Sequence, residues 1–234
     1  ENPIFLDMAR WNKTEVCKRE FFAAQKQIGT LGGGNHFIEV QAGDDGHIWF
    51  MIHSGSRNLG KQVAEFYNQK AVKLCKMYKQ DAIAAQDLAF LPIGYYEAGM
   101  YINEMKLCLD FAFENRKMIA DSIKKIFMEE FPQITFEKDI NIHHNYATVE
   151  EHCHRKVWVH RKGATLARKE TIGIIPGSQG TSSYIVQGLG NEVSLQSCSH
   201  GAGRCMSRKK AIQDLSLNAE QEILNRQGIV HRMN

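Results

Sequence analysis

Residues 35–54, NHFIEVQAGDDGHIWFMIHS, hold two runs of alternating apolar and polar side chains around a short polar centre. Residues 35–42 and 47–54 alternate as strands do, and Gly43-Asp44-Asp45-Gly46 between them has the composition of a tight turn. This stretch therefore predicts a β-hairpin.

The hairpin brings two histidines together. If Gly43 and Gly46 flank the turn, His36 lies directly opposite His53, with the Cβ atoms about 5 Å apart. Such a pair can bind a metal ion jointly, provided that a third ligand and groups that orient the rings are present. The two rings can instead stack in a polar core, which is the commoner arrangement for a random hairpin.

A third ligand is available from residues 139–147. Strand alternation there places His144 and His143 on opposite faces, so that at most one of them joins a given metal site. Imidazole alone suits zinc, copper, iron or nickel, whereas added oxygen from Asn35 or Glu39 moves the preference toward manganese.

Outward from the hairpin, apolar stripes predict helices over residues 15–28, 60–80 and 100–131. Further strands are predicted over residues 140–147, 156–161, 172–175 and 183–187. We therefore predict an α+β fold, in which residues 1–234 form a single domain with a β-rich core and a helical insertion at about 60–131.

The composition is that of an ordinary soluble globular protein, with 43% hydrophobic and 24% charged residues in 234. The sequence has no run that could span a bilayer and no leader, so we expect a cytoplasmic protein without a membrane partner. Its six cysteines form no CxxC pair or disulfide-scaffold pattern, which favours free thiols.

The net charge of +3 is too small for a general binder of polyanions. Basic residues nevertheless cluster in the last third of the chain, at Arg161-Lys162, Arg168-Lys169, Arg204 and residues 208–210. A clustered basic surface attracts phosphates. The alternative for residues 208–210 is a solvated helix face.

Residues 197–204, SCSHGAGR, place His200 at the entrance of a glycine turn. Glycines allow a phosphate to approach the backbone, and a helix after them would turn its N–H groups toward that phosphate. This arrangement suits a histidine nucleophile that attacks phosphorus, although small residues before a helix are usually only a turn. The turn at residues 176–183, PGSQGTSS, offers further amides and hydroxyls to a phosphate.

Six ordered motifs carry a family resemblance. They are GGGNHFIE at 32–39, HSGSR at 53–57, HHNYA at 143–147, RKGA at 161–164, PGSQGT at 176–181 and SHGAGR at 199–204. In this order and over about four-fifths of the chain, they resemble the motifs of the RtcB family of RNA-splicing ligases.

The resemblance implies a GTP- and manganese-dependent RNA ligase of tRNA splicing or RNA repair. Such an enzyme joins RNA ends that carry a 3′-phosphate or 2′,3′-cyclic phosphate to 5′-hydroxyl ends, through a covalent histidine–GMP intermediate on the residue matching His200. The implied manganese ligands are His36, His53 and His144. The implied guanylate-binding residues are Asn35, Asn145, Ser178, Ser183, His200, Gly201, Ala202, Gly203 and Arg204, and the implied charge stabilisers are Arg57, Lys162 and Arg204.

The sequence departs from the family's pattern in two places. The family has an upstream Asp-x-Gly-Cys-Gly motif that binds the metals and a lysine near the C-terminus that contacts guanine, and neither is present. We therefore expect a fragment that lacks part of the site. Two alternatives to the ligase stay open: a metal-dependent phosphoesterase, and an inactive RNA-binding fragment.

Overall fold

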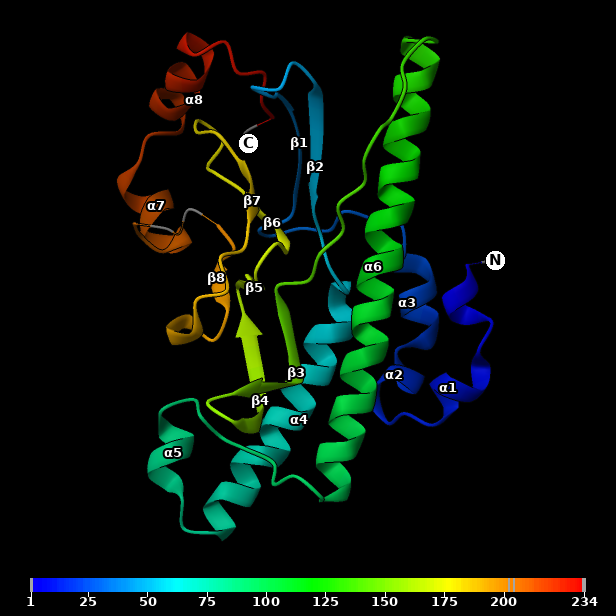
Figure 1. The fold of residues 1–234 in the computed structure, drawn as a ribbon, viewed down its shortest axis with the longest axis vertical. Coiled ribbons are helices and arrows are strands. Elements are labelled where there is room, and N and C mark those ends of the chain that lie inside the picture. The colour runs from blue at the N-terminus through cyan, green and yellow to red at the C-terminus, as the bar shows by residue number, and fades with distance from the viewer. Residues whose placement is uncertain (1, 202, 204, 233–234) are drawn as a thin grey trace. The chain divides into compact units, whose positions relative to one another are not determined.

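The structure is a computed structural model that describes residues 2–201, 203 and 205–232 (Figure 1). The chain divides into two compact units, Glu1–Asn141 and Ile142–Asn234, and each is described by itself.

The first unit contains η1 (Pro3–Phe5), α1 (Met8–Asn12), α2 (Val16–Arg19), α3 (Phe21–Gln27), β1 (Phe37–Ala42), β2 (Ile48–His53), α4 (Arg57–Met77), α5 (Asp81–Ala85) and α6 (Tyr96–Glu130). The second contains β3 (Asn145–His152), β4 (Arg155–Lys162), β5 (Ala164–Leu166), β6 (Ile172–Ile175), β7 (Tyr184–Gln187), η2 (Glu192–Ser194), β8 (Ser197–Ser199), α7 (Arg208–Asp214) and α8 (Leu217–Arg226).

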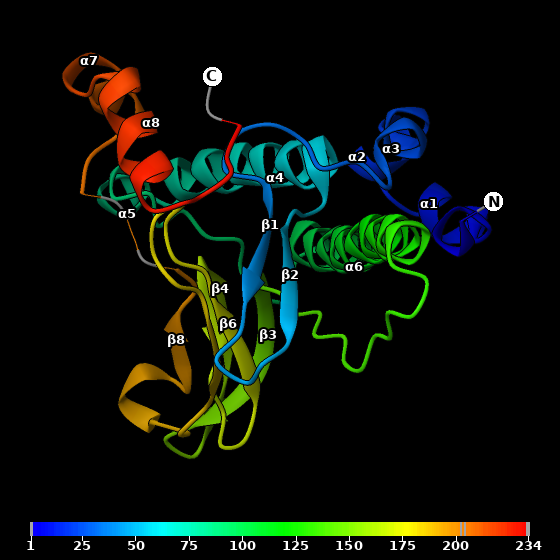
Figure 2. The same ribbon diagram turned by 90° about the horizontal axis from the view of Figure 1, so that it is seen from above.

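The first unit is built on two long helices, α4 and α6, which lie side by side (Figures 1 and 2). Their facing apolar side chains, among them Leu59, Val63 and Phe111, form one buried cluster with residues of the N-terminal helices. Within that cluster, Trp11 stacks on Phe5 with ring centroids 5.4 Å apart. The predicted helices at 60–80 and 100–131 are thus confirmed, each with a start three or four residues earlier.

The helix predicted over residues 15–28 is instead two short helices, α2 and α3, that meet at Glu20. A buried carboxylate explains how α2 begins: Glu104 of α6 accepts hydrogen bonds from the backbone amides of Val16 and Cys17, at 2.9 and 2.8 Å, and from the Tyr67 hydroxyl at 2.7 Å. The amides at the start of α2 are therefore satisfied by a distant side chain.

The predicted hairpin is present, but its register differs by one residue from the prediction. Phe37, not His36, lies opposite His53, and Ala42 lies opposite Ile48. The turn has five residues because the Asp45 carboxylate accepts a hydrogen bond from the amide of His47 at 3.0 Å, while the amide of Gly43 donates to the carbonyl of His47 at 2.8 Å. His36 therefore lies just before β1, outside the regular pleat.

The strands of the second unit form antiparallel pairs: β3 with β4, β5 with β8, and β6 with β7. The predictions for β4, β6 and β7 are confirmed within one residue at each end. The strand predicted over 140–147 is wrong, because β3 begins only at Asn145, and both His143 and His144 precede it. The three-residue strands β5 and β8 were not predicted.

The mixture of helices and antiparallel strands agrees with the predicted α+β class. The single domain with a helical insertion stays a prediction beside the two compact units. All six cysteines are free. Among the residues that the structure describes, none of the helices combines the length and the apolar character needed to span a membrane.

Candidate functional site

In the first unit, His36 and His53 lie close together. Their ring centroids are 6.3 Å apart, with 35° between the planes, although the register does not pair them directly. The Nδ1 atom of His36 is buried and has no hydrogen-bond partner among the described residues. Burial, and then the positive charge of Arg57, lower the pKa of His36 below its usual 6.5. At neutral pH this imidazole is therefore uncharged, as a metal ligand must be.

Arg57 is the first residue of α4 and lies beside His36. Its backbone has a φ of +57°, in the left-handed region that few residues other than glycine adopt. Its Nε atom donates to the Thr30 hydroxyl at 3.1 Å. A Cβ at Gly32 would overlap the Arg57 guanidinium and would approach Nδ1 of His36 to 2.7 Å, so the arginine and the histidine need a glycine at this position.

The backbone that follows His53 is tied to α6 by Asn115, a fully buried residue that sequence reasoning did not single out. The Asn115 side chain donates to the Ser54 hydroxyl and to the Gly55 carbonyl, both at 3.1 Å, and accepts from the amide of Thr30 at 3.1 Å. One amide group therefore joins the segment that precedes His36 to the segment that follows His53. Asn35 is exposed directly before His36, and Glu39 accepts a hydrogen bond from Gln41 at 3.0 Å.

In the second unit, the rings of His144 and His200 lie close together, with centroids 4.7 Å apart. His144 directly precedes β3 and His200 directly follows β8. The Asn145 side chain bonds to Nδ1 of His144 at 2.7 Å and accepts from the amide of Gly163 at 2.8 Å. The neighbouring His143 instead contacts the Tyr146 ring. The rings of the two adjacent histidines therefore contact different residues.

The ring of His200 lies over Gly163, which has a φ of +63°. A Cβ at Gly163 would lie 2.9 Å from Cε1 and 3.1 Å from Nδ1 of His200. The turn between β4 and β5 thus leaves room for the ring because it carries a glycine. Lys162, beside this glycine, is exposed.

The polar turn at residues 176–183 is closed by its own hydroxyls. The amide of Ser178 donates to the Thr181 hydroxyl at 2.7 Å, and the amide of Gly177 donates to the Ser183 hydroxyl at 3.1 Å. Gly201 lies against this turn, because a Cβ there would be 3.6 Å from the Pro176 carbonyl oxygen. The structure thus brings the turn close to the segment that follows His200.

Two sequence predictions concern the segment after His200. The prediction of a helix directly after the glycine turn is wrong, and the other prediction falls partly on residues outside the described ones. The next helix, α7, begins only at Arg208 and is capped by the Ser207 side chain, so it does not present its N-terminus at the glycine turn. Ala202 and Arg204 lie outside the described residues. Gly203 is exposed with a φ of +78°.

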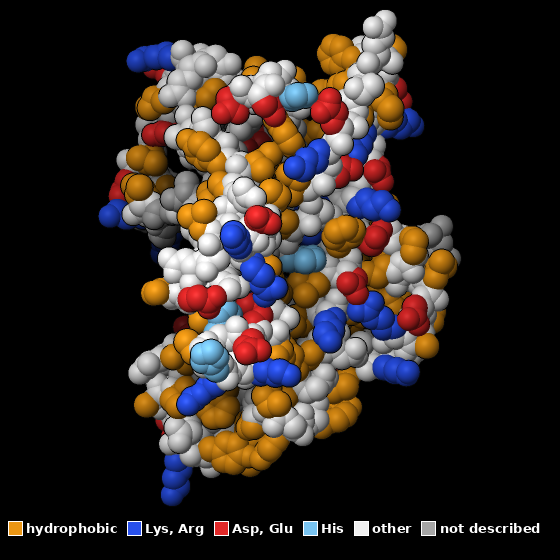
Figure 3. Space-filling view, viewed as in Figure 1, with side chains coloured by type: hydrophobic (Ala, Val, Ile, Leu, Met, Phe, Trp, Pro, Cys, Tyr) orange, Lys and Arg blue, Asp and Glu red, His pale blue; other side chains and the backbone are white. Residues whose placement is uncertain are grey.

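The expected basic surface also needs correction at Arg161. This side chain is buried, with a relative exposure of 2%, and pairs with Glu150. Elsewhere, Figure 3 shows Lys and Arg side chains interspersed with Asp and Glu over the face drawn, in keeping with the small net charge.

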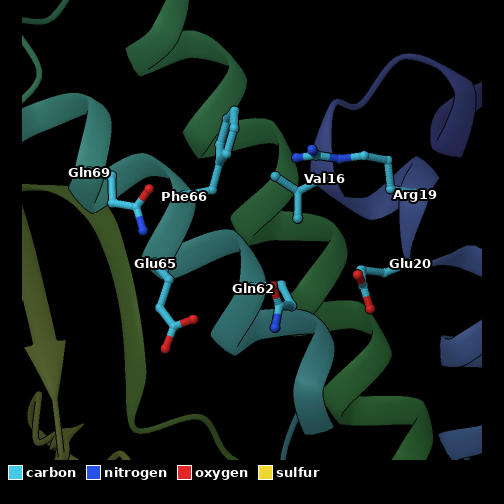
Figure 4. A pocket seen from close by; sticks show the side chains of 7 residues that line it. All are labelled: Val16, Arg19, Glu20, Gln62, Glu65, Phe66 and Gln69. Carbon is cyan, nitrogen blue, oxygen red and sulfur yellow. The ribbon is translucent and has the colours of Figure 1, made fainter.

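A pocket of the first unit lies between α2 and α4, away from its histidines (Figure 4). The Arg19 guanidinium carbon lies 5.1 Å from the centroid of the Phe66 ring, and both residues line the pocket with Val16, Glu20, Gln62, Glu65 and Gln69. None of the predicted site residues is among them, so this pocket adds nothing to the histidine sites.

Comparison with known proteins supplies the family. The family described as tRNA-splicing ligase RtcB matches residues 7–234. The chain is 40% identical to the RNA-splicing ligase RtcB of Escherichia coli strain K12 over 193 residues, which cover 80% of this chain and 47% of that protein. It is 35% identical over 243 residues to the tRNA-splicing ligase RtcB of Aeropyrum pernix, covering 88% of this chain and 50% of the relative. The Pyrobaculum aerophilum protein of the same name is 33% identical over 258 residues, 94% of this chain and 53% of the relative.

The chain thus spans about half the length of these relatives. The family match covers nearly the whole of this sequence and includes all six motifs. This chain belongs to the RtcB family.

Proposed function

We propose that this chain carries the nucleotide-accepting histidine of a GTP- and manganese-dependent RNA ligase. The reaction joins an RNA 3′-phosphate or 2′,3′-cyclic phosphate end to a 5′-hydroxyl end. The observation that carries the proposal is the pairing of His200 with His144 beside Gly163, in a family whose members are named RNA-splicing and tRNA-splicing ligases.

His200 acts as the nucleophile. An unprotonated ring nitrogen attacks the α-phosphorus of GTP, a nitrogen–phosphorus bond forms, and the bond to pyrophosphate breaks. The GMP group then passes to the RNA 3′-phosphate and frees the imidazole. The 5′-hydroxyl oxygen attacks the activated RNA phosphorus, loses its proton, and displaces GMP. A 2′,3′-cyclic phosphate is first opened by water.

His36, His53 and His144 are the proposed manganese ligands. The uncharged state of His36 and its buried, unpartnered Nδ1 atom support this assignment, because they leave a donor atom for a ligand. Oxygen from Asn35 adds the harder donor that manganese favours over zinc. When bound, manganese neutralises phosphate charge and polarises the phosphorus under attack.

The remaining residues bind the nucleotide. We assign guanylate contacts to Asn35, Asn145, Ser178, Ser183, Gly201, Ala202, Gly203 and Arg204, and stabilisation of phosphate charge to Arg57, Lys162 and Arg204. The hydroxyls of the turn at 176–183 and the segment after His200 lie close together, which supports a shared phosphate site in the second unit.

The test is covalent labelling of the full-length protein with α-³²P-GTP and manganese. We expect label that survives denaturation, and we expect His200→Ala to lose it. The matched control is His160→Ala, which removes an exposed histidine of the same unit and should keep the label. Chelation by EDTA should abolish labelling, and added manganese should restore it.

Two results would overturn the proposal. Absence of label together with hydrolysis of a 2′,3′-cyclic phosphate would favour the phosphoesterase. RNA binding without label, hydrolysis or retained metal would favour an inactive RNA-binding protein.

A further inference from the structure

Arg161 of β4 is buried, and it holds a charged partner within the second unit. Its Nη1 and Nη2 atoms donate to the two carboxylate oxygens of Glu150 at 2.5 and 3.0 Å. Nη1 also donates to the Tyr146 hydroxyl at 3.3 Å. This two-pronged contact fixes the plane of the guanidinium group, since both nitrogens must face both oxygens.

The edge of the same guanidinium group formed by Nε and Nη2 binds the segment that leads into β8. Nε donates to the Ser197 hydroxyl and Nη2 donates to the Leu195 carbonyl, both at 3.0 Å. Leu195 and Gln196 have φ values of +50° and +49°. Non-glycine residues hold such a conformation only where surrounding contacts enforce it, and Arg161 supplies one contact to Leu195 and one to Ser197, which follows Gln196.

His200 depends on this segment for its position. β8 contains only Ser197–Ser199, paired with the three residues of β5, and His200 follows it directly. Arg161 therefore binds the first residue of β8, while Gly163, two residues further along the chain than Arg161, underlies the His200 ring at the other end. One short stretch of chain contacts both ends of the strand that presents the histidine.

We propose that Arg161, oriented by Glu150, is a positioning residue for His200. The inference rests on the proposed role of His200 as the nucleophile. A buried ion pair is a weak source of net stability, because desolvation offsets much of the attraction. The guanidinium group of Arg161 instead fixes positions. It holds the Glu150 carboxylate of β3, the strained turn at Leu195 and the start of β8 relative to one another.

The test is Arg161→Lys in the full-length protein. Lysine keeps a positive charge opposite Glu150, but a single ammonium group cannot reach Glu150, Leu195 and Ser197 together. We expect the single-turnover rate of His200 guanylylation at saturating GTP to fall at least about tenfold. The GTP concentration that gives half the maximal rate should change by less than about threefold, because the lysine variant retains the groups that bind GTP.

A matched control separates positioning from stability. Val159 is a buried residue of the same strand, and Val159→Ala should lower the melting temperature without removing a hydrogen bond to β8. We expect this variant to guanylylate within about twofold of the wild-type rate, even where its melting temperature falls as far as that of Arg161→Lys. An equal loss of rate in both variants would overturn the inference.

Ser197→Ala tests the same contact with a smaller change. It removes the hydroxyl that accepts from Nε of Arg161 and leaves the pair with Glu150 intact, so it remains informative if the lysine variant does not fold. We expect about a threefold lower rate, and amide hydrogen exchange that is faster in β8 than in wild type but unchanged in β6.

Exchange also distinguishes the two possible failures. If wild-type protein takes no label while the Arg161 and Ser197 variants loosen β8, the proposed function fails and the structural coupling stands. If wild-type protein is labelled while both variants keep the wild-type rate and the wild-type exchange of β8, the positioning role is wrong.

Discussion

In one unit a neutral side chain holds the backbone beside the histidine pair, and in the other a charged side chain does so. In the first, the neutral side chain of Asn115 ties down the backbone after His53. In the second, the charged side chain of Arg161 ties down the backbone before His200. A buried amide needs only hydrogen-bond partners, whereas a buried guanidinium also needs a counter-ion. The contacts of Arg161 in the second unit should therefore respond to pH, whereas those of Asn115 in the first should not.

The surroundings of the two residues differ in the same way. The hydrophobic cluster of the first unit contains several aromatic residues, including Trp11, Phe21 and Phe111. Among the described residues of the second unit, the buried hydrophobic side chains are Ala147, Val159 and Leu224, and the buried polar ones are Glu150, His152, Arg161 and Thr165. A charged pair is thus buried in the second unit, whereas the buried amide of the first unit lies in a unit with an aromatic hydrophobic cluster.

The largest effect is expected from Glu150→Gln. Loss of the carboxylate leaves Arg161 buried without its counter-ion and should lower the free energy of unfolding of the second unit by about 3–5 kcal/mol near neutral pH. The hydrogen bond with Arg161 lowers the pKa of the Glu150 carboxyl. Its stabilisation is therefore complete above the ordinary carboxyl pKa of about 4 and is lost as the pH falls through the lowered value.

Urea unfolding at several pH values, followed by ¹⁹F NMR of fluorotryptophan-labelled protein, measures this difference. Trp158 reports the second unit and Trp11 reports the first. The wild type and Glu150→Gln should converge as the medium becomes acidic, whereas Val159→Ala should lose the same free energy throughout. A constant difference for Glu150→Gln would show that the charge of Glu150 does not matter.

A smaller effect is expected from Asn115→Ala. This change leaves the amide of Thr30, the Ser54 hydroxyl and the Gly55 carbonyl without their buried partner, which should cost about 1–3 kcal/mol. The loss should be independent of pH, and the Thr30 amide should exchange faster with solvent. Lys117→Ala, an exposed change on the same helix, serves as the control and should stay within about 0.5 kcal/mol of wild type. A loss that varied with pH would remove the contrast between the units.

Local patterns in the sequence predicted much of this fold. Alternation and turn composition found the hairpin and strands β4, β6 and β7, and apolar stripes found α4 and α6. The register of the hairpin was wrong because the Asp45 side chain determines the length of the turn. The pairing of β5 with β8 was missed because strands of three residues are too short to show alternation.

The candidate site was predicted in parts. The motifs named each histidine, and the structure groups His36 with His53 and His144 with His200. Asn115 and Arg161 were not recognised as supports because their partners lie far away in the sequence. For Arg161 a signal existed: it follows Val157 and Val159 in strand alternation, which places it on the buried face of β4.

The smallest effect is expected from a second Arg–Glu pair in the same unit. Arg226 and Glu222 of α8 are 3.2 Å apart, but their side chains are 78% and 68% exposed, against 1% and 5% for Arg161 and Glu150. Water already solvates both exposed charges, so Glu222→Gln should change the free energy of unfolding by less than about 0.5 kcal/mol. Glu150→Gln and Glu222→Gln make the same chemical change. The difference between their losses of free energy of unfolding, measured at Trp158, therefore gives the effect of burying the pair. If Glu222→Gln lowered the free energy of unfolding as much as Glu150→Gln does, burial of the Arg161–Glu150 pair would not be what distinguishes the second unit from the first.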